Sequence, residues 1–373
     1  MKVQILQENL NKGLTIASRS ISAKAQLPVL ANVLLKTDKN RLQISATNLE
    51  NGVSLWLGAK IEKDGETTIP ARILSEIVSS LPAGKIDLEV TENSLSFSSG
   101  GYTAKLNGIS ASEFPKQPTY STENLFSIPA EKLLLAIGQV AFSAATDEGR
   151  PVLTGVLIKI KGKELSMVAT DGYRLSLRRM ELDALVKEEV SVILPAKTLL
   201  EVARIIAEEK GQNGQVSLGY TKEQNQVVFV FPDLELYSRV IEGEFPDFEK
   251  IIPETNNSKI SIDRESFNRA VKIVSVFARE SANIVKLEAE DGVLKMSANS
   301  PQVGENTNNL EVKLEGEKTE IAFNFRFLQA FLNAVTAPEI IIETNGSLSP
   351  CVFKESGNND FLHIIMPVRL QTE

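Results

Sequence analysis

The sequence predicts an α+β protein built from three tandem, similar domains, and a recurring strand is the first evidence for it. The pattern Leu-x-(Ile or Met)-x-Ala occurs at residues 42–46, 165–169 and 294–298. The offsets are 165 − 42 = 123 and 294 − 165 = 129 residues, and one third of the 373-residue chain is about 124. In each copy the recurring apolar residues occupy alternate positions, and the residues between them are polar except Val168. This alternation is typical of a strand. A tandem triplication explains this spacing.

Each third of the chain opens with a predicted helix, and these helices are the second observation. Residues 8–21, 131–144 and 265–279 carry apolar residues at helical spacing, so one stripe of each helix can face a core. Pro129 before the second helix and Asp263 before the third are both typical of helix starts. A strand, a polar turn (38–40, 161–163 and 291–292) and the recurring strand follow each helix.

A second helix is expected later in each third. These helices begin at residues 69–72, 194–197 and 323–326 and run to about residues 81, 210 and 335, and β-like alternation follows each. The first two thirds close on Glu-Phe-Pro, at residues 113–115 and 244–246. Two helices among many short strands predict helices packed on one face of an antiparallel sheet. Polar stretches place the domains at 1–124, 125–258 and 259–373.

Composition limits the function. Lys and Arg total 40 against 48 Asp and Glu, so the net charge of −8 argues against tight nucleic-acid binding by bulk charge, although a local basic face is compatible with it. The single cysteine, Cys351, cannot form an internal disulfide and fits a reducing compartment. Gln4, Gln7 and Glu8 lie where a signal peptide needs an apolar run, and no apolar stretch is long enough to span a bilayer. We therefore expect a cytoplasmic protein without membrane contact.

The search for catalytic chemistry finds little. The only histidine, His363, lies in an apolar, strand-like run that favours a structural role. A dyad with Cys351 is the alternative, but no third orienting group is near either residue in the sequence. Gly162-Lys163 is followed by glutamate, so it is not a phosphate loop, and no cluster of Cys and His has metal-ligand spacing. The residues predict a binding protein with no catalytic residue, metal or cofactor.

Basic residues recur at equivalent helical positions. Arg72, Lys197 and Arg326 come at the same early position of the second helices, and Arg204 shares a face with Lys197. Two further pairs share a face of the first and fifth helices: Lys12 with Arg19, and Lys272 with Arg279. For one helix, a solvated face is the simpler interpretation, and Glu76, Glu201 and Glu208 dilute the pattern. Repetition in several helices favours a shared cationic surface.

Three segments carry a family resemblance: Ala-Thr-Asp-Gly-Tyr-Arg-Leu at 169–175, Gly-Glu-Phe-Pro-Asp-Phe at 243–248 and Met-Pro-Val-Arg-Leu at 366–370. With the triplication, the whole chain resembles the bacterial DNA polymerase III beta subunits, the sliding clamps. Tyr173 and Val368 stand where the family often has His and Met, and three residues follow Leu370. The resemblance implies the DNA clamp fold, with two subunits joined head to tail in a closed ring. Helices would line the hole, and continuous sheet would form the rim.

The implied function is a non-catalytic processivity factor in DNA replication. The ring would encircle duplex DNA without sequence preference, and its implied partners are a second copy of the chain, the polymerase III alpha subunit, the clamp loader, and other DNA polymerases and repair proteins with clamp-binding peptides. A ring that holds DNA by topology needs only weak phosphate contacts, which suits the negative net charge. The alternatives are a repeat scaffold without DNA and a carboxylate-based hydrolase. Retention on closed circular DNA separates the clamp from both.

The resemblance also implies three sets of site residues. The residues expected to face DNA are Lys24, Arg72, Lys197, Arg204, Lys272 and Arg279. Those expected at the dimer interface are Ala104 and Leu106 against Ile273 and Phe277. A pocket for partner peptides is expected where the second and third domains meet, at Leu153, Thr170, Gly172, Tyr173, Arg174, Leu175, Pro246, Ile251, Leu348, Pro350, Met366, Pro367, Val368, Arg369 and Leu370. The equivalent segments 47–52 and 299–301 lack Tyr-Arg-Leu, so one pocket per subunit is expected.

Overall fold

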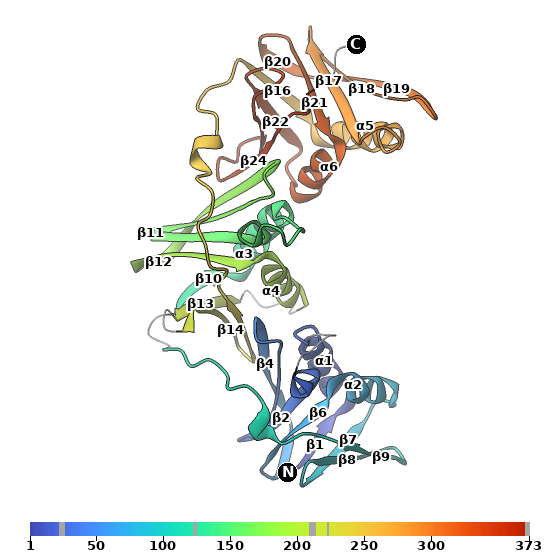
Figure 1. Ribbon diagram of the computed structural model, residues 1–373, viewed down its shortest axis with the longest axis vertical. Helices are drawn as coiled ribbons and strands as arrows, with labels where there is room; N and C mark the ends of the chain where they lie inside the picture. The colour runs from blue at the N-terminus through green and yellow to red at the C-terminus, as the bar shows by residue number, and fades with distance from the viewer. Residues whose placement is uncertain (22–26, 122–124, 209–213, 222–223, 370–373) are drawn as a thin grey trace. The chain divides into compact units, whose positions relative to one another are not determined.

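The computed structural model describes residues 1–21, 27–121, 125–208, 214–221 and 224–369 (Figure 1). The chain divides into two compact units. Unit 1 comprises residues 1–128 and 214–240, and unit 2 comprises residues 129–213 and 241–373. Each unit holds two antiparallel sheets and the helices packed on them, so the α+β class is confirmed.

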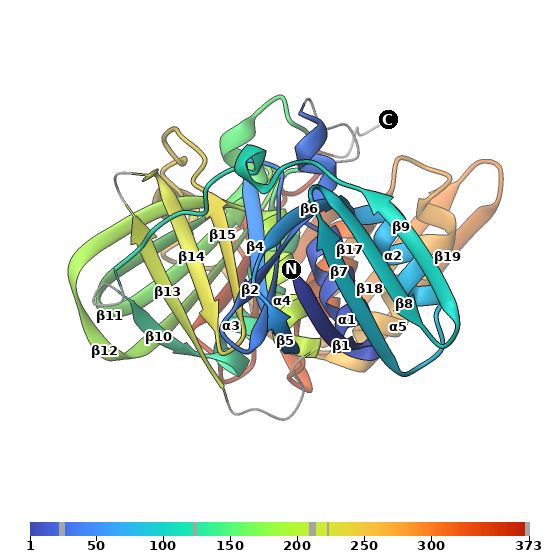
Figure 2. The ribbon, with the colours of Figure 1, turned by 90° about the horizontal axis from the view of Figure 1, so that it is seen from below.

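Unit 1 has a five-stranded and an eight-stranded sheet. The first has the order β5 (Lys60–Lys63), β1 (Lys2–Leu6), β7 (Lys85–Thr91), β8 (Ser94–Ser99), β9 (Tyr102–Asn107). The second has the order β10 (Phe126–Pro129), β13 (Gln215–Thr221), β14 (Gln226–Phe231), β15 (Leu234–Arg239), β4 (Asn51–Gly58), β3 (Arg41–Thr47), β2 (Asn32–Asp38), β6 (Glu66–Pro70). Figure 2 shows β13, β14, β15 and β4 side by side, so strands of the first and second repeats share one sheet.

Unit 2 has a seven-stranded and a four-stranded sheet. The larger has the order β11 (Gly155–Thr170), β12 (Arg174–Pro195), β24 (Phe361–Ile365), β23 (Cys351–Glu355), β22 (Glu339–Thr344), β16 (Ser258–Asp263), β20 (Lys313–Gly316). The smaller has the order β19 (Gly304–Glu311), β18 (Val293–Ser300), β17 (Ile284–Glu290), β21 (Thr319–Asn324). Here strands of the second and third repeats share the larger sheet.

All six predicted helices are present in the described residues: α1 (Gln7–Ser18), α2 (Ala71–Ser80), α3 (Ala130–Val140), α4 (Ala196–Glu208), α5 (Arg264–Ala278) and α6 (Phe325–Ala334). The predicted caps are confirmed, because Pro129 precedes α3 and the Asp263 carboxylate accepts the Ser266 N–H at 2.8 Å. The predicted apolar stripes are buried, as Leu14, Ile137 and Val271 illustrate. In the third repeat, α5, α6 and the strands share one described core.

The turn predicted at residues 161–163 is partly wrong. Strand β11 continues through it, although Gly162 has φ +63° and the pairing with β12 shifts on both sides. Ile160 lies opposite Val190, whereas Glu164 lies opposite Glu181, so the ladder jumps along β12 within four residues of β11. A glycine in the left-handed region lets the strand bend without ending. The predicted turns near residues 39 and 291 do separate strands.

Strand pairing repeats with the same period as the sequence. The first residue of each recurring strand lies opposite an apolar residue of the next strand, in the pairs Leu42–Leu57, Leu165–Met180 and Leu294–Leu310. The strand before it pairs with the strand that leads into the second helix, in the pairs Val33–Ile69, Val156–Leu194 and Val285–Phe323. The three repeats are therefore equivalent in register as well as in sequence.

A substitution at Gly52 tests the pairing of β4 with β15, which joins the first two repeats within unit 1. Gly52 lies opposite Tyr237, and a Cβ at this position would overlap the tyrosine ring. Because overpacking a tight site costs about 1–3 kcal/mol, we expect Gly52→Ala to lower the free energy of unfolding by that amount. The matched control is Gly58→Ala in the same strand, where a Cβ meets no atom within 4 Å. Urea unfolding of the full chain measures both, and equal midpoints would contradict the expectation.

Candidate functional site

The turn between β11 and β12 is held by two side chains. Thr170 Oγ1 donates to the Arg174 carbonyl at 2.7 Å and accepts the Gly172 N–H at 3.0 Å. Asp171 Oδ1 accepts the N–H groups of Tyr173 at 2.9 Å and Arg174 at 3.0 Å. Short polar side chains before a turn often satisfy its backbone in this way. The turn is rigid, and it leaves the Tyr173 side chain 64% exposed.

Glycine is favoured at position 172, in the centre of this turn. Its φ is +92°, which an L side chain rarely adopts, so its interpretation as a turn glycine is confirmed. A Cβ would also lie 3.2 Å from Nη1 of Arg150, whose Nη2 donates to the Asp171 carbonyl at 3.0 Å. The backbone conformation therefore disfavours a residue with a Cβ, and Arg150 would have to move by a few tenths of an ångström to admit one.

Arg174 braces the turn from inside. Its Nε lies 3.0 Å from Asp171 Oδ2, and its side chain is only 15% exposed. The guanidinium lies 5.5 Å from the ring centre of Phe142 and 4.8 Å from that of Phe327, so it is held between aromatic residues of the second and third repeats. Donation to a peptide carbonyl or bracing of the turn were both open from the sequence, and the contacts favour bracing. Nothing in the sequence pattern indicated Phe142 or Phe327.

Strand pairing brings the C-terminal segment to the turn. Strand β12 pairs with β24, and the Met366 N–H donates to the Tyr173 carbonyl at 2.8 Å. Strand β24 also pairs with β23, which places Pro350, the residue before β23, at the same end of the sheet. Met366, Pro367 and Val368 are half-buried and Arg369 is exposed, whereas Leu370 lies outside the described residues. Leu348, in the loop before β23, is 62% exposed.

An apolar cluster supports these residues from below. Leu175 is buried in it with Phe248, Val352 and Ile364, and Phe245 packs against it. Phe245 and Phe248 flank the exposed Pro246 in the Glu-Phe-Pro segment, and Ile251 follows, partly exposed, in a short 3-10 turn (Glu249–Ile251). The structure thus brings Leu175 and the segment around Pro246 together. Leu153, buried in the 3-10 turn Pro151–Thr154, and Leu348 are not among the described members of this cluster.

His363 and Cys351 have structural roles. His363 is fully buried, and its Nδ1 is 2.8 Å from the Ser176 hydroxyl, which is itself 2.8 Å from the Ser143 hydroxyl. Cys351 is buried, its Sγ donates to the Glu343 carbonyl at 3.2 Å, and burial raises the pKa of its thiol. In the sheet, His363 lies opposite Phe353 on one side and opposite Ser176 on the other. The two side chains have separate partners, which argues against a Cys-His dyad.

The basic residues expected to face DNA are on exposed helix faces. Arg72 on α2, Lys197 and Arg204 on α4, and Lys272 and Arg279 on α5 are all exposed, whereas Lys24 lies outside the described residues. Helices α1 and α2 pack together, as do α3 with α4 and α5 with α6. In Figure 1 the helices of each unit lie on one side of that unit's sheets. Each unit therefore presents a helical surface that carries cations.

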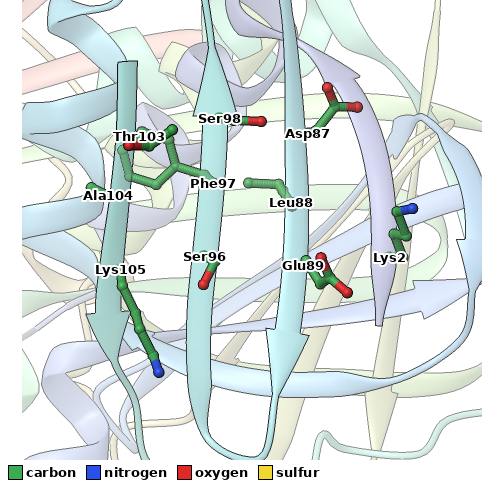
Figure 3. Close-up of a pocket in the computed structure, with 10 residues that line it drawn as sticks. All are labelled: Lys2, Asp87, Leu88, Glu89, Ser96, Phe97, Ser98, Thr103, Ala104 and Lys105. Carbon is green, nitrogen blue, oxygen red and sulfur yellow. The ribbon is translucent and has the colours of Figure 1, made fainter. Parts of the chain in front are cut away.

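Two of the expected interface residues lie on an edge strand, and the other two lie on a helix that packs beside an edge strand. Strand β9 ends one sheet of unit 1, and Ala104 and Leu106 lie half-buried on the same face of it. Strand β19 ends one sheet of unit 2, and Ile273 (49% exposed) and half-buried Phe277 belong to α5, which packs on β18 and β19. Beside β9, the outer sheet face has a shallow hollow of about 410 Å³ with polar side chains such as Ser96, Ser98 and Lys105 (Figure 3).

No helix in the described part of the chain is long and apolar enough to cross a membrane. No three His, Cys, Asp or Glu side chains among the described residues are grouped where they could hold a metal ion.

Comparison with known proteins gives the family. Models of the N-terminal, central and C-terminal domains of the DNA polymerase III beta subunit match residues 1–118, 127–247 and 249–369. The beta sliding clamp of Synechococcus elongatus is 32% identical over 100% of both chains, and that of Bacillus subtilis is 28% identical over 99% of this chain and 100% of its own. The chain belongs to the DNA polymerase III beta subunit family, the sliding clamps.

Solved structures agree with this assignment. The sliding clamp of Bacillus subtilis superposes with a TM-score of 0.95 at 27% identity, covering 100% of both chains. The beta subunit of Thermotoga maritima has a TM-score of 0.90 at 30% identity, covering 99% of this chain and 100% of that one. A Pseudomonas aeruginosa clamp bound to griselimycin has a TM-score of 0.93 at 29% identity, with the same coverage. The fold class and the three tandem domains are therefore confirmed.

His363 gives a test of the buried site in solution. Burial, and then the positive charge of Arg174, lower the pKa of His363 to about 3, so the imidazole stays neutral in the folded chain. With one histidine in the sequence, a single imidazole NMR signal should keep its shift between pH 8 and pH 5. Because the folded pKa lies below the unfolded value of about 6.5, this group's contribution to stability is lost as pH falls from about 6.5, by up to about 1.4 kcal/mol per pH unit. A titration midpoint near pH 6.5 in the folded protein would contradict this assignment.

Proposed function

We propose that the chain forms a ring that encircles duplex DNA and tethers the replicative polymerase to it, in two copies joined head to tail. The chain belongs to a family of sliding clamps, which are non-catalytic subunits that confer processivity. The observation that carries the ring proposal lies within one chain. The two junctions between repeats, β15 with β4 and β24 with β12, use the same strand pairing. Among the described strands, β9 and β19 are the equivalent edge strands that end their sheets without such a partner.

The strands that can join one repeat to the next have equivalent residues in all three repeats. The strand after the recurring strand is β4, β12 or β19, and its equivalent residues are Gly52, Leu175 and Glu305, which lie opposite Thr47, Thr170 and Asn299. The last strand of each repeat is β9, β15 or β24, and its equivalent residues are Ala104, Leu236 and His363, which lie opposite Phe97, Phe229 and Phe353.

Neighbouring repeats meet at two strand junctions within the chain. Within unit 1, β15 pairs with β4 and places Leu236 opposite Val53, the residue after Gly52. Within unit 2, β24 pairs with β12 and places His363 opposite Ser176, the residue after Leu175. A further bond recurs: the Arg239 N–H donates to the Glu50 carbonyl at 2.7 Å, as Met366 does to Tyr173 at 2.8 Å. Both junctions have the same register.

The edge strands β9 and β19 can form the same junction between two subunits. Strand β9 of one subunit on β19 of another would repeat the register and place Ala104 opposite Asn306 of the partner subunit. Lys105 would then lie opposite Glu305 of the partner subunit, and opposite charges in directly facing positions stabilise a sheet. Ala104 and Leu106 would lie on the sheet face that carries α5 of the partner subunit, near the partner's Ile273 and the partner's Phe277. Two such junctions related by a two-fold axis close a ring of six repeats.

A disulfide tests this register. We expect oxidation of the Lys105→Cys, Glu305→Cys variant to give a covalent dimer on a non-reducing gel, because directly opposite residues are within disulfide range. The control, Lys105→Cys with Asn309→Cys, moves one cysteine four positions along the same strand face, about 13 Å away, and should not cross-link. The native Cys351 is buried and gives little background. Equal cross-linking of both variants would contradict the register.

A second test concerns the interface itself. A dimer that survives Ile273→Asp, or a monomer at micromolar concentration, would contradict the ring interface.

The Lys105→Cys, Glu305→Cys variant also tests whether the ring encircles DNA. Oxidised after mixing with closed circular DNA, the sealed ring should stay on the circle through a high-salt wash and leave when the DNA is linearised. A protein held by ordinary contacts would leave both in high salt. For short linear duplexes we propose weak, salt-dependent binding through Lys24, Arg72, Lys197, Arg204, Lys272 and Arg279. Nanomolar binding to one specific sequence would contradict sliding.

The partner site proposed for this ring is the turn at Tyr173 with its surroundings. A peptide rich in Gln, Leu and Phe needs apolar contacts and a few polar groups that fix its orientation. Support comes from the rigid turn, the neighbouring Met366 and the apolar cluster under Leu175 and Pro246. The flexible thioether of Met366 suits several peptides. The proposed users are the polymerase III alpha subunit, the clamp loader, and other polymerases and repair proteins with such peptides.

Truncation tests the peptide site. Removing residues 366–373 deletes Met366 and its bond to Tyr173, so peptide affinity should fall at least about tenfold, which is roughly 1.4 kcal/mol, while dimer formation persists. The control removes only residues 371–373 and should bind normally. Calorimetry gives both affinity and stoichiometry. Unchanged binding after the longer deletion, or more than two peptides per dimer, would show that the site is misplaced.

We also propose domain boundaries at 1–124, 125–258 and 259–373, and a cytoplasmic location. The first boundary falls between the family domains matched at residues 1–118 and 127–247, whereas the second falls where a polar stretch leads into β16, inside the match at residues 249–369. The buried thiol of Cys351 suits a reducing compartment.

A further inference from the structure

The cations on the helical surfaces are not equivalent. Arg72 Nε lies 2.9 Å from Glu76 Oε1 on α2, and Arg204 Nη1 lies 3.3 Å from Glu201 Oε2 on α4. Lys197 on the same face of α4 has no ion pair within the described residues. Two of the exposed arginines are thus held by a glutamate of their own helix.

Helix stability does not explain the Arg72 pair. The Arg72 side chain is 90% exposed, and exposed ion pairs of this kind contribute little to stability. Arginine four residues before glutamate is also the weaker of the two orders on a helix. In addition, Arg72 lies in the first turn of α2, where the helix dipole disfavours a cation. The sequence therefore places this cation against the local preference and then pairs it with an acid.

The pairing changes what each arginine offers to a phosphate. A guanidinium binds phosphate best through two parallel N–H bonds, and Glu76 already occupies Nε of Arg72. A phosphate that reaches the remaining donors also lies close to the glutamate charge, which repels it. Lys197 has no such competitor among the described residues, so its ammonium keeps all its donors for phosphate.

We propose that Glu76 and Glu201 are positioning residues that hold Arg72 and Arg204 back from full phosphate contact and so keep the ring's grip on DNA weak. This proposal rests on the proposed function, because it assumes that these helix faces meet duplex DNA. A ring retained by topology gains nothing from tight contacts, since each one must break for the ring to slide.

The experiment compares wild type with the Glu76→Gln, Glu201→Gln variant of the full chain. Glutamine keeps the size of the side chain and removes its charge. Anisotropy with a short linear duplex between 50 and 200 mM salt gives the affinity and the slope of log K against log salt. We expect at least threefold tighter binding at 50 mM salt and a slope steeper by up to about 0.9 for each arginine freed to contact a phosphate.

Two controls separate local pairing from net charge. Glu131→Gln, at an exposed position of α3, makes the charge change of either single substitution, Glu76→Gln or Glu201→Gln. Glu131 has no ion pair within the described residues, so this change should raise the affinity much less than either of them. Glu76→Gln in an Arg72→Gln background should give no gain, because the arginine to be released is absent. A gain equal to that of Glu131→Gln, or a gain that persists without Arg72, overturns the proposal.

Failure of the inference is distinct from failure of the proposed function. If the sealed cysteine ring stays on circular DNA but the double glutamine variant binds as wild type does, the ring is right and the role of the two glutamates is wrong. If the sealed ring is not retained on circular DNA, the clamp function fails and this inference fails with it.

Discussion

Backbone hydrogen bonding at strand edges is the constraint on which the rest of this structure depends. A strand at the end of a sheet has unpaired N–H and C=O groups, and a protein must cover, shield or pair them. Here each repeat pairs one edge with its neighbour, β4 with β15 in unit 1 and β12 with β24 in unit 2. The same pairing brings Met366 to Tyr173, so the candidate peptide site is a by-product of how two repeats join.

The first repeat contains the same turn without the same side chains. Thr47 and Asn48 bond to the backbone of residues 49–51 as Thr170 and Asp171 bond to residues 172–174. Leu49 has φ +75° at the position of Gly172, a conformation that costs a leucine about 1–2 kcal/mol. The first two repeats therefore share this hydrogen-bond frame, and Tyr173 distinguishes the copy that we propose for peptide recognition.

The sequence alone predicts the parts of this fold that depend on local periodicity. Apolar spacing locates the helices, the recurring strand reveals the triplication, and turn residues such as Gly172 are recognisable by type. Sequence could not predict what depends on contacts between distant segments. The placement of Arg174 between Phe142 and Phe327 requires two repeats to meet. Likewise, the ladder jump at Gly162 depends on how β12 bends, which no local signal in β11 reveals.

The junctions inside the chain and the proposed junction between chains share a strand pairing but differ in how they are tethered. At β4–β15 and β12–β24 the partners belong to one polypeptide, so each edge meets the other at an effective concentration set by the connecting segment, of order millimolar for short links. Strand β9 and its partner's β19 have no such link and meet only as often as free subunits do. A ring built this way has two weak points and four strong ones, although all six use the same geometry. The fraction of subunits in closed rings would then follow the cellular concentration of the chain. Force or dilution would open the ring at its two junctions between subunits before any domain came apart.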